Sequence, residues 1–171
     1  MALFYADASA LVKLVRDEPE SDALRAFLED ADLVSSELVL TEVPRAIRRA
    51  VAHDPQLPLD ALLERAGELL DAVALLPLDR ALLIAAGTLD EPALRALDAI
   101  HVTSALDLAA LDAFVSYDER QSAAARLAGL RTVAPAAPAQ VLPDSAEGDA
   151  PEQAPRGPQD ERDAAPPADE A

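Results

Sequence analysis

The sequence predicts an α/β protein in which a parallel sheet is covered by helices on both faces. Short apolar runs alternate with longer segments whose apolar residues recur every three or four positions. Such alternation of strands and helices is typical of parallel sheets, because each strand needs a crossover to reach the next. A change in composition at Pro135 marks the end of the pattern.

The first half of the chain begins with a short apolar strand at residues 3–6, followed at once by a helix with one apolar face. A second helix opens at Ser21, and a second strand covers residues 33–35. The helix that follows begins between residues 36 and 41 and reaches about Ala52. It contains Pro44, which must lie in its first turn or kink it, because proline lacks the N–H that helical bonding needs.

The second half continues the pattern after a loop at residues 53–58, which holds two prolines. Helices are expected at residues 59–71, 80–86, 93–108 and 119–128, and strands at 73–76, 113–117 and 131–133. With the first half, these segments supply five strands.

The segment from Pro135 to Ala171 differs sharply from the body. It holds eight of the fourteen prolines, and nine Asp or Glu against two Arg. Such a segment cannot bury enough apolar surface to offset the entropy lost on ordering. We therefore predict a folded domain at residues 1–134 and a disordered acidic tail at 135–171. The simplest role of the tail is to aid solubility.

The composition excludes several classes of protein. There is no cysteine, so disulfides and thiolate metal sites are absent. No apolar run reaches the roughly 18–20 residues of a membrane span, and the N-terminus lacks a signal-peptide pattern. We expect a cytoplasmic protein without a membrane segment. The net charge of −18 argues against a general nucleic-acid coat protein, so any contact with RNA needs divalent cations, local arginines or a partner.

Two acidic residues stand where predicted strands end. Asp7 closes the first strand and Asp118 closes the fourth. Ligands of open parallel sheets bind outside the carboxyl ends of the strands, which makes both residues candidates for a site. Each can also be a helix N-cap, and Gln121 would complete a capping box with Asp118. The two interpretations are compatible, because a cap and a metal ligand both need a carboxylate at that point.

Asp98 and Glu42 lie within predicted helices among apolar neighbours. Asp98 shares a helical face with Leu94 and Val102. A carboxylate in an apolar stripe needs an ion-pair partner or a metal, so the alternative to a metal site is an ion pair, for example with Arg95. Glu42 shows a weaker form of this pattern, and its alternative is a solvated position paired with a nearby arginine.

If these four carboxylates converge, they form an all-oxygen site that suits Mg²⁺ or Mn²⁺ better than zinc. Their charges would repel one another without a cation between them. Such ions activate water and stabilise a leaving oxygen, which makes phosphodiester hydrolysis the natural chemistry. With five glycines in the chain, no phosphate-binding loop or dinucleotide fingerprint competes for the role.

Four motifs in this order resemble the VapC-type PIN domain, a ribonuclease family, over roughly residues 1–135. They are Tyr5–Leu14 (YADASALVKL), Thr41–Val43 (TEV), Leu97–His101 (LDAIH) and Phe114–Asp118 (FVSYD). The resemblance implies a PIN-like three-layer fold with a five-stranded parallel sheet. It also implies a Mg²⁺- or Mn²⁺-dependent endoribonuclease, the toxin of a type II toxin–antitoxin system, that forms a homodimer and binds a VapB-type antitoxin.

By this resemblance the catalytic residues and metal ligands are the acidic quartet Asp7, Glu42, Asp98 and Asp118. Ser9 and Ser116 match hydroxyl positions that support the quartet. Two other functions remain open. One is a non-catalytic PIN-fold binding or regulatory module, and the other is a metal-dependent nuclease acting on DNA.

Four basic or titratable residues near the quartet have two interpretations. Arg45, Arg48 and Arg49 are predicted to contact RNA or the antitoxin, with a solvated helix face as the alternative. His101 could be a general base or a ligand. We interpret it instead as a packed or surface helix residue, because metal-activated water needs no histidine.

Overall fold

The computed structural model describes residues 1–92 and 94–136. Apart from Pro135 and Ala136, the predicted tail at 135–171 lies outside the described residues. The hydroxyl of Tyr117 donates a hydrogen bond to the carbonyl of Pro135 at 2.6 Å. This hydrogen bond connects Pro135, the first residue of the predicted tail, to the folded body.

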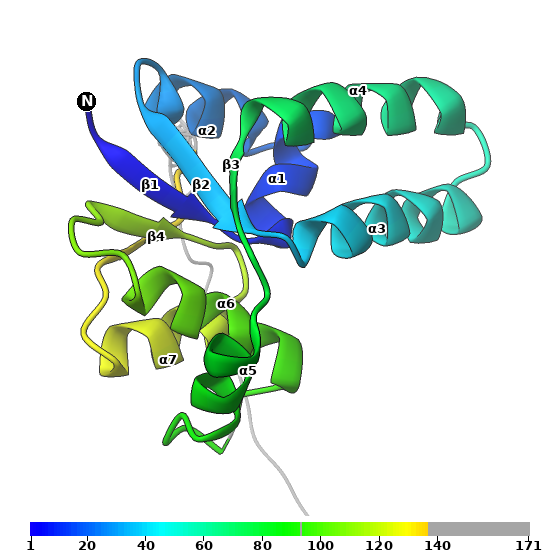
Figure 1. Cartoon of the computed structure of the whole chain (residues 1–171). Coiled ribbons are helices and arrows are strands. Elements are labelled where there is room, and N and C mark those ends of the chain that lie inside the picture. Colours follow the sequence, from blue (N-terminus) through cyan, green and yellow to red (C-terminus); the bar gives the residue numbers. More distant parts are fainter. Residues whose placement is uncertain (93, 137–171) are drawn as a thin grey trace, which may run out of the picture. The chain divides into compact units, whose positions relative to one another are not determined.

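Within the described residues, five parallel strands form the sheet in the order β3-β2-β1-β4-β5 (Figure 1). The strands are β1 (Leu3–Ala6), β2 (Asp32–Ser36), β3 (Ala74–Leu76), β4 (Ala113–Val115) and β5 (Thr132–Val133). Strand β1 lies in the centre, with Tyr5 paired to Val34 of β2 on one side and to Phe114 of β4 on the other. The predicted five-stranded parallel sheet is confirmed.

The order of the strands places a topological switch point at the centre of the sheet. After β1 the chain builds outward through β2 and β3, then crosses back to add β4 and β5 on the opposite side of β1. In open parallel sheets the crevice for ligands lies beyond the carboxyl ends of the two strands at this point. Here these strands are β1 and β4, which are followed by Asp7 and Ser116.

Helices cover both faces of the sheet, as predicted. They are α1 (Ala8–Val15), α2 (Ser21–Leu28), α3 (Val39–His53), α4 (Leu59–Ala72), α5 (Arg80–Gly87), α6 (Ala96–Leu106) and α7 (Glu119–Leu127). Helices α1 to α4 contribute to one buried cluster, and α6 and α7 contribute to the cluster on the other face. Figure 1 shows the two groups on either side of the strands, with α5 beside α6.

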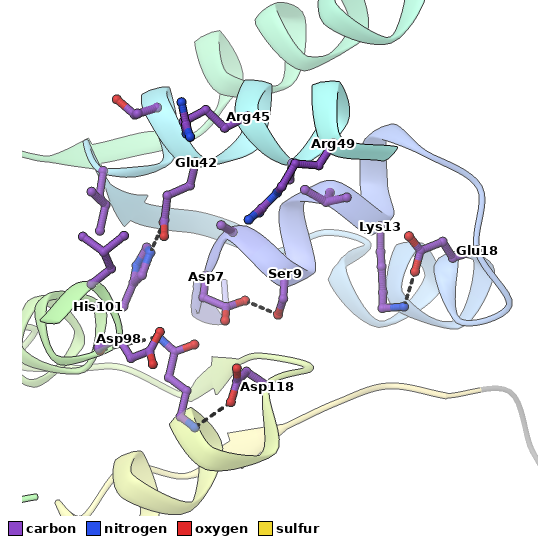
Figure 2. A pocket seen from close by; sticks show the side chains of 17 residues that line it. Asp7, Ser9, Lys13, Glu18, Glu42, Arg45, Arg49, Asp98, His101 and Asp118 are labelled. Carbon is purple, nitrogen blue, oxygen red and sulfur yellow. Dashed lines mark hydrogen bonds and ion pairs between the residues drawn. The ribbon is translucent and has the colours of Figure 1, made fainter. Parts of the chain in front are cut away.

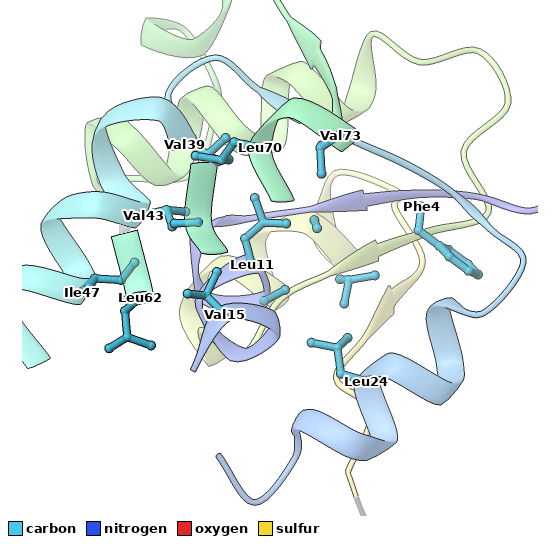
Figure 3. Packing of buried hydrophobic residues seen from close by; sticks show 14 of the residues in the cluster. Phe4, Leu11, Val15, Leu24, Val39, Val43, Ile47, Leu62, Leu70 and Val73 are labelled. Carbon is cyan, nitrogen blue, oxygen red and sulfur yellow. The ribbon is translucent and has the colours of Figure 1, made fainter. Parts of the chain in front are cut away.

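Side-chain alternation along β1 divides the core between the two faces. Phe4 and Ala6 point into the larger cluster, whereas Tyr5 points into the smaller one. In the larger cluster Leu11 of α1 and Val43 of α3 are fully buried (Figure 3). Burial of each such side chain contributes about 1.5–3 kcal/mol. This packing fixes α1 and α3 against β1, and so determines where the polar residues at their ends lie.

Two details differ from the sequence prediction. Pro44 lies inside α3, in its second turn, and not in its first turn. The carbonyl left without an N–H partner belongs to Leu40, which is 51% exposed, so water can satisfy it. Helix α6 begins at Ala96 and not near residue 93, so Leu94 does not share a helical face with Asp98.

Candidate active site

Asp7 lies at the junction between β1 and α1 and is 3% exposed. It caps α1, since its Oδ1 accepts a hydrogen bond from the backbone N–H of Ala10 at 3.0 Å. The same oxygen accepts from the Ser9 hydroxyl at 2.6 Å, and Oδ2 accepts from the Ser116 hydroxyl at 2.7 Å. Burial raises the pKa of the Asp7 carboxyl, and these donors oppose the shift.

Ser9 and Ser116 join the ends of the two central strands. Each hydroxyl donates to Asp7 and accepts from a backbone N–H after β4. The Ser9 hydroxyl accepts from Tyr117 at 2.8 Å, and the Ser116 hydroxyl accepts from Asp118 at 3.1 Å. The two serines thus hold the Asp7 carboxylate between the β1–α1 and β4–α7 junctions.

Asp118 is the N-cap of α7. Its Oδ1 accepts from the backbone N–H groups of Arg120 and Gln121 at 2.9 and 3.0 Å. The predicted cap is therefore present. The side chain remains 33% exposed, and its other oxygen, Oδ2, lies 3.8 Å from the guanidinium of Arg120. One carboxylate oxygen is consequently used by the helix end, and the other forms a long ion pair with Arg120 beside the cavity.

Glu42 projects from the first turn of α3 and meets His101 of α6. Glu42 Oε2 lies 2.7 Å from His101 Nε2, and His101 Nδ1 lies 2.8 Å from the hydroxyl of Tyr5. His101 is 2% exposed, so the interpretation as a packed helix residue holds, but its ring also contacts the acidic site. No arginine pairs with Glu42 in the described part of the chain.

The sequence contains a pattern that could have indicated this contact. A histidine on a helix with buried Val102 and Ala105 beside it, and a tyrosine in a buried strand, are two polar rings in an apolar core. Buried polar groups need hydrogen-bond partners, which makes a contact between such rings a reasonable expectation. The position of Glu42 next to them depends on how α3 packs, and the sequence does not reveal it.

Asp98 lies in the first turn of α6 and is half-buried. Its Oδ2 accepts from the backbone N–H of Arg95 at 3.4 Å, a long contact at the start of the helix. Of the two apolar neighbours proposed for Asp98, Val102 lies on α6 and is fully buried, whereas Leu94 precedes the helix. Within residues 1–92 and 94–136, Asp98 makes no ion pair with Arg95 or any other residue, and its carboxylate lines the cavity with this one long hydrogen bond.

All four acids line one cavity of about 600 Å³ (Figure 2). Ser9, His101, Arg45 and Arg49 line it as well, whereas Arg48 does not. In Figure 2, Glu42 and the two arginines come from α3 on one side, and Asp7 and Asp118 lie across the space. The four predicted acids therefore share one cavity at the switch point of the sheet. The three predicted arginines divide into two that reach the cavity and one that does not.

The electrostatics of this cavity are unusual for so acidic a chain. Arg45 and Arg49 make no ion pair within the described residues, although Asp and Glu outnumber Lys and Arg by 32 to 14 in the whole sequence. Lys13 also lines the cavity, but Glu18 and Glu20 bind its ammonium group. Two unpaired guanidinium groups therefore stand beside four carboxylates, and an anionic ligand could bind at this edge.

The donor set fits a hard divalent cation, because it consists of carboxylate and hydroxyl oxygens without thiolates. In the described residues, however, no three Asp, Glu or His side chains lie close enough together to hold an ion. Asp7 is fixed by three donors, while Asp98 and Asp118 are half-buried at helix starts. The carboxylates are therefore too far apart to surround an ion as they stand, and binding one would require their side chains to move closer together.

Residues 4–127 match the family model of the PIN domain, so this chain belongs to the PIN-domain family. Its relatives include Ribonuclease VapC46 and Ribonuclease VapC35 of Mycobacterium tuberculosis, each 39% identical to it. These alignments cover 79% and 78% of this chain, and 99% and 97% of the relatives. The resemblance to VapC-type PIN domains seen in the four motifs is confirmed.

Two solved structures share the fold. They are PAE2754 from Pyrobaculum aerophilum, with a TM-score of 0.55 and 19% identity, and VapBC2 from Rickettsia felis bound to a promoter DNA fragment, with 0.58 and 13%. Each match covers 77% of this chain, and 83% and 98% of the respective structures. At these identities the likeness bears on the fold alone. Every helix in the described part of the chain is too short or too polar to cross a membrane.

Proposed function

We propose that this protein is a Mg²⁺- or Mn²⁺-dependent endoribonuclease, the toxin of a type II toxin–antitoxin system. It would hydrolyse phosphodiester bonds in RNA. The observation that carries the proposal is the convergence of Asp7, Glu42, Asp98 and Asp118 on one cavity at the switch point of the sheet. The names of the relatives, which are ribonucleases VapC46, VapC35 and VapC47, support the same activity.

The four acids are the residues that would hold the metal. When bound, the ion would polarise a phosphoryl oxygen and lower the pKa of a coordinated water. Asp7 is the natural anchor, because its position is fixed by Ser9, Ser116 and the start of α1. Its raised pKa reflects a buried negative charge, and a cation beside it would relieve that burial penalty.

Arg45 and Arg49 are the residues that would bind the RNA backbone. They lie one turn apart on α3, both line the cavity, and neither has an ion-pair partner in the described residues. A guanidinium group binds phosphate through two parallel N–H donors. Local arginines at the site offset the overall charge of −18, which would otherwise repel RNA.

The partners follow from the same family membership. We propose a VapB-type antitoxin as the protein partner, because a structure with this fold is a VapBC complex. We also propose a homodimer and a cytoplasmic location, which the resemblance to VapC-type PIN domains implies.

A non-catalytic PIN-fold module is the second candidate function. One observation favours it, namely that no three acidic or histidine side chains in the described residues are positioned to hold an ion. The two candidates differ in what a divalent cation does. The nuclease needs the ion for cleavage, whereas the module would neither bind it nor cut RNA.

The deciding experiment is cleavage of a structured RNA pool by the full chain, purified free of antitoxin, with Mg²⁺, Mn²⁺ or EDTA. Asp98→Asn tests the cavity, and Asp71→Asn is the matched control, because Asp71 is an exposed carboxylate on α4. We expect metal-dependent cleavage that Asp98→Asn abolishes and Asp71→Asn preserves. Full activity of Asp98→Asn would refute the proposed site. Cleavage of a matched DNA pool without cleavage of the RNA pool would show that the substrate is DNA and not RNA.

A further inference from the structure

A buried hydrogen-bonded chain connects the central strand to the acidic cavity. It runs from the Tyr5 hydroxyl to His101 Nδ1 at 2.8 Å, and from His101 Nε2 to Glu42 Oε2 at 2.7 Å. Tyr5 is fully buried and His101 is 2% exposed, whereas the Glu42 side chain is 22% exposed. The chain therefore begins in the core and ends at a carboxylate that lines the cavity.

We propose that His101, oriented by Tyr5, is a positioning residue that holds one oxygen of Glu42 and so presents the other oxygen to the metal. This inference rests on the proposed function, in which Glu42 is a metal ligand. It assigns His101 neither a contact with RNA nor a role as general base.

The hydrogen-bond partners determine which nitrogen of His101 carries the proton. His101 Nε2 lies 2.7 Å from Glu42 Oε2, and a carboxylate oxygen can only accept a hydrogen bond, so the proton of this contact is on Nε2. In a neutral imidazole with its proton on Nε2, Nδ1 has the lone pair and accepts from the Tyr5 hydroxyl at 2.8 Å. The contact with Tyr5 thus favours the same tautomer as the contact with Glu42.

The packing around Tyr5 prevents the rings of Tyr5 and His101 from rotating. The Tyr5 ring stacks on Phe114 with ring centroids 5.3 Å apart and planes 9° apart, and the His101 ring meets Tyr5 edge-on at 5.9 Å. The buried rings of Tyr5 and His101 thus fix the position of the Glu42 carboxylate on α3 relative to β1.

Glu42 needs such support more than Asp7 does. Asp7 has a short side chain with donors on both oxygens. Glu42 has one more rotatable bond, and His101 is its hydrogen-bond partner in the described residues. Partners that orient a ligating carboxylate typically affect metal affinity by about 10–100-fold. Loss of His101 should therefore weaken metal binding through Glu42.

The first test observes the tautomer in the metal-free full chain. The protein has two histidines, His53 and His101, so ¹⁵N NMR of the imidazoles is readily assigned with His53→Gln. His53 Nδ1 lies 2.7 Å from the carbonyl of Arg49, so neutral His53 carries its proton on Nδ1. We expect the opposite tautomer, with the proton on Nε2, for His101. A His101 ring with its proton on Nδ1 alone would overturn the proposal.

The second test measures Mn²⁺ affinity by electron paramagnetic resonance of the free ion. We expect His101→Leu to weaken binding by about 10–100-fold. His101→Gln, whose amide can still donate to Glu42, should restore most of the affinity. In a Glu42→Gln background, His101→Leu should cause little further loss, because the carboxylate that His101 positions for the metal is already gone. His53→Gln is the control and should bind as the wild type does.

The outcomes separate the two proposals. If the wild-type protein binds Mn²⁺ and a folded His101→Leu variant binds it equally well, the positioning role is refuted and the nuclease proposal stands. If the wild-type protein binds no Mn²⁺, the metal-dependent function fails and the positioning role fails with it. Should His101→Leu not fold, Tyr5→Phe serves instead, since it keeps the ring stack and removes only the hydroxyl. Unchanged Mn²⁺ affinity in Tyr5→Phe would contradict the role of Tyr5.

Discussion

The cavity has two sides that hold their acids by different means. The strand-end side consists of Asp7, Ser9, Ser116 and Asp118, and the helix side consists of Glu42, Asp98 and His101. On the strand-end side, hydrogen bonds from serine hydroxyls and backbone N–H groups fix the carboxylates where parallel strands end. On the helix side, carboxylates from α3 and α6 line the same cavity although those helices pack on opposite faces of the sheet.

This difference means that the strand-end side follows from local chain geometry, and the helix side from tertiary packing. A residue directly after a strand has its position set by strand register, here the pairing of Ala6 with Val115. The position of a side chain on a helix face depends on the length, start and tilt of the helix. We therefore expect substitutions on the strand-end side to change both stability and activity, and those on the helix side to change mainly activity.

The largest expected effect is that of Asp7→Asn on the strand-end side. Loss of an anchoring metal ligand should reduce RNA cleavage by about 10²–10³-fold, since a metal contributes several kcal/mol to transition-state stabilisation. The same change should raise the thermal midpoint of the metal-free protein, because it removes a buried charge. Cleavage assays and melting curves in EDTA measure the two effects, and a lower midpoint at neutral pH would contradict the second.

The pH dependence of that stabilisation has a defined sign. The pKa of Asp7 is raised in the folded protein, so the native state binds this proton more tightly than the unfolded state. The wild type therefore loses stability as the pH rises from about 4, the ordinary value for Asp, through the raised pKa. The advantage of Asp7→Asn should be small at the acidic end of this window and complete above it. An advantage independent of pH would show that burial of the charge is not its cause.

Removing either serine of the strand-end side should reduce stability next most strongly. Ser116→Ala removes a donor to Asp7 and the acceptor of the Asp118 N–H. Ser9→Ala does the same for Asp7 and the Tyr117 N–H. Each should lower the free energy of unfolding by about 1–3 kcal/mol, the penalty for unsatisfied buried groups.

Chemical denaturation at neutral pH measures these losses. Ser122→Ala is the matched control, because the hydroxyl of this buried serine makes one long hydrogen bond of 3.5 Å to a carbonyl. It should lose less stability than either of the other serine variants. Equal losses in all three would mean that the loss comes from removing a buried hydroxyl and not from the support of Asp7.

A smaller effect separates the arginines of α3. Arg45→Gln and Arg49→Gln should each reduce the dependence of RNA affinity on log salt concentration by about 0.7, the value for one phosphate contact on a single strand. Arg48→Gln should leave it unchanged, because Arg48 does not line the cavity. Binding of a non-cleaved RNA to an Asp98→Asn protein, titrated at several salt concentrations, measures the slopes. If all three variants showed the same dependence of RNA affinity on salt concentration, Arg45 and Arg49 would not be specific RNA contacts, and contact with the antitoxin would be the remaining interpretation.

The smallest expected effect is on the stability of the helix side. Glu42→Gln keeps an oxygen that can accept from His101 Nε2, and the side chain is partly exposed. Its free energy of unfolding should lie within about 0.5 kcal/mol of the wild type. A loss as large as that of Ser116→Ala would remove the distinction between the two sides.

The same division explains what the sequence could predict. The five strands and the acids Asp7 and Asp118 follow from periodicity and from the ends of apolar runs, which are local properties. The predicted start of α6 is wrong, because the first turn of a helix resembles the loop before it in composition. Asp98 nevertheless lines the cavity, because the error affects Leu94 and leaves Val102 one turn after Asp98 on α6.

His101 shows what local patterns miss. Its contacts, Tyr5 and Glu42, are 96 and 59 residues away in the sequence. Only the packing of α3 and α6 at the same end of the sheet brings the three together. Likewise, helical periodicity places Arg45 and Arg49 one turn apart, but the rotation of α3 about its axis decides that they, and not Arg48, face the cavity.

The hydrogen bond between Ser116 and Asp7 also constrains when the cavity can exist during translation. These residues are 109 positions apart, so at about 5–20 residues per second the ribosome adds the second roughly 5–20 s after the first. The central strand β1 emerges first, yet it gains its β4 neighbour only late in synthesis. A nascent chain therefore lacks the assembled carboxylate site until most of the domain has been made. Products of interrupted translation that stop between Asp98 and Ser116 would carry Asp7, Glu42 and Asp98 but lack Asp118 and the hydrogen bond that fixes Asp7.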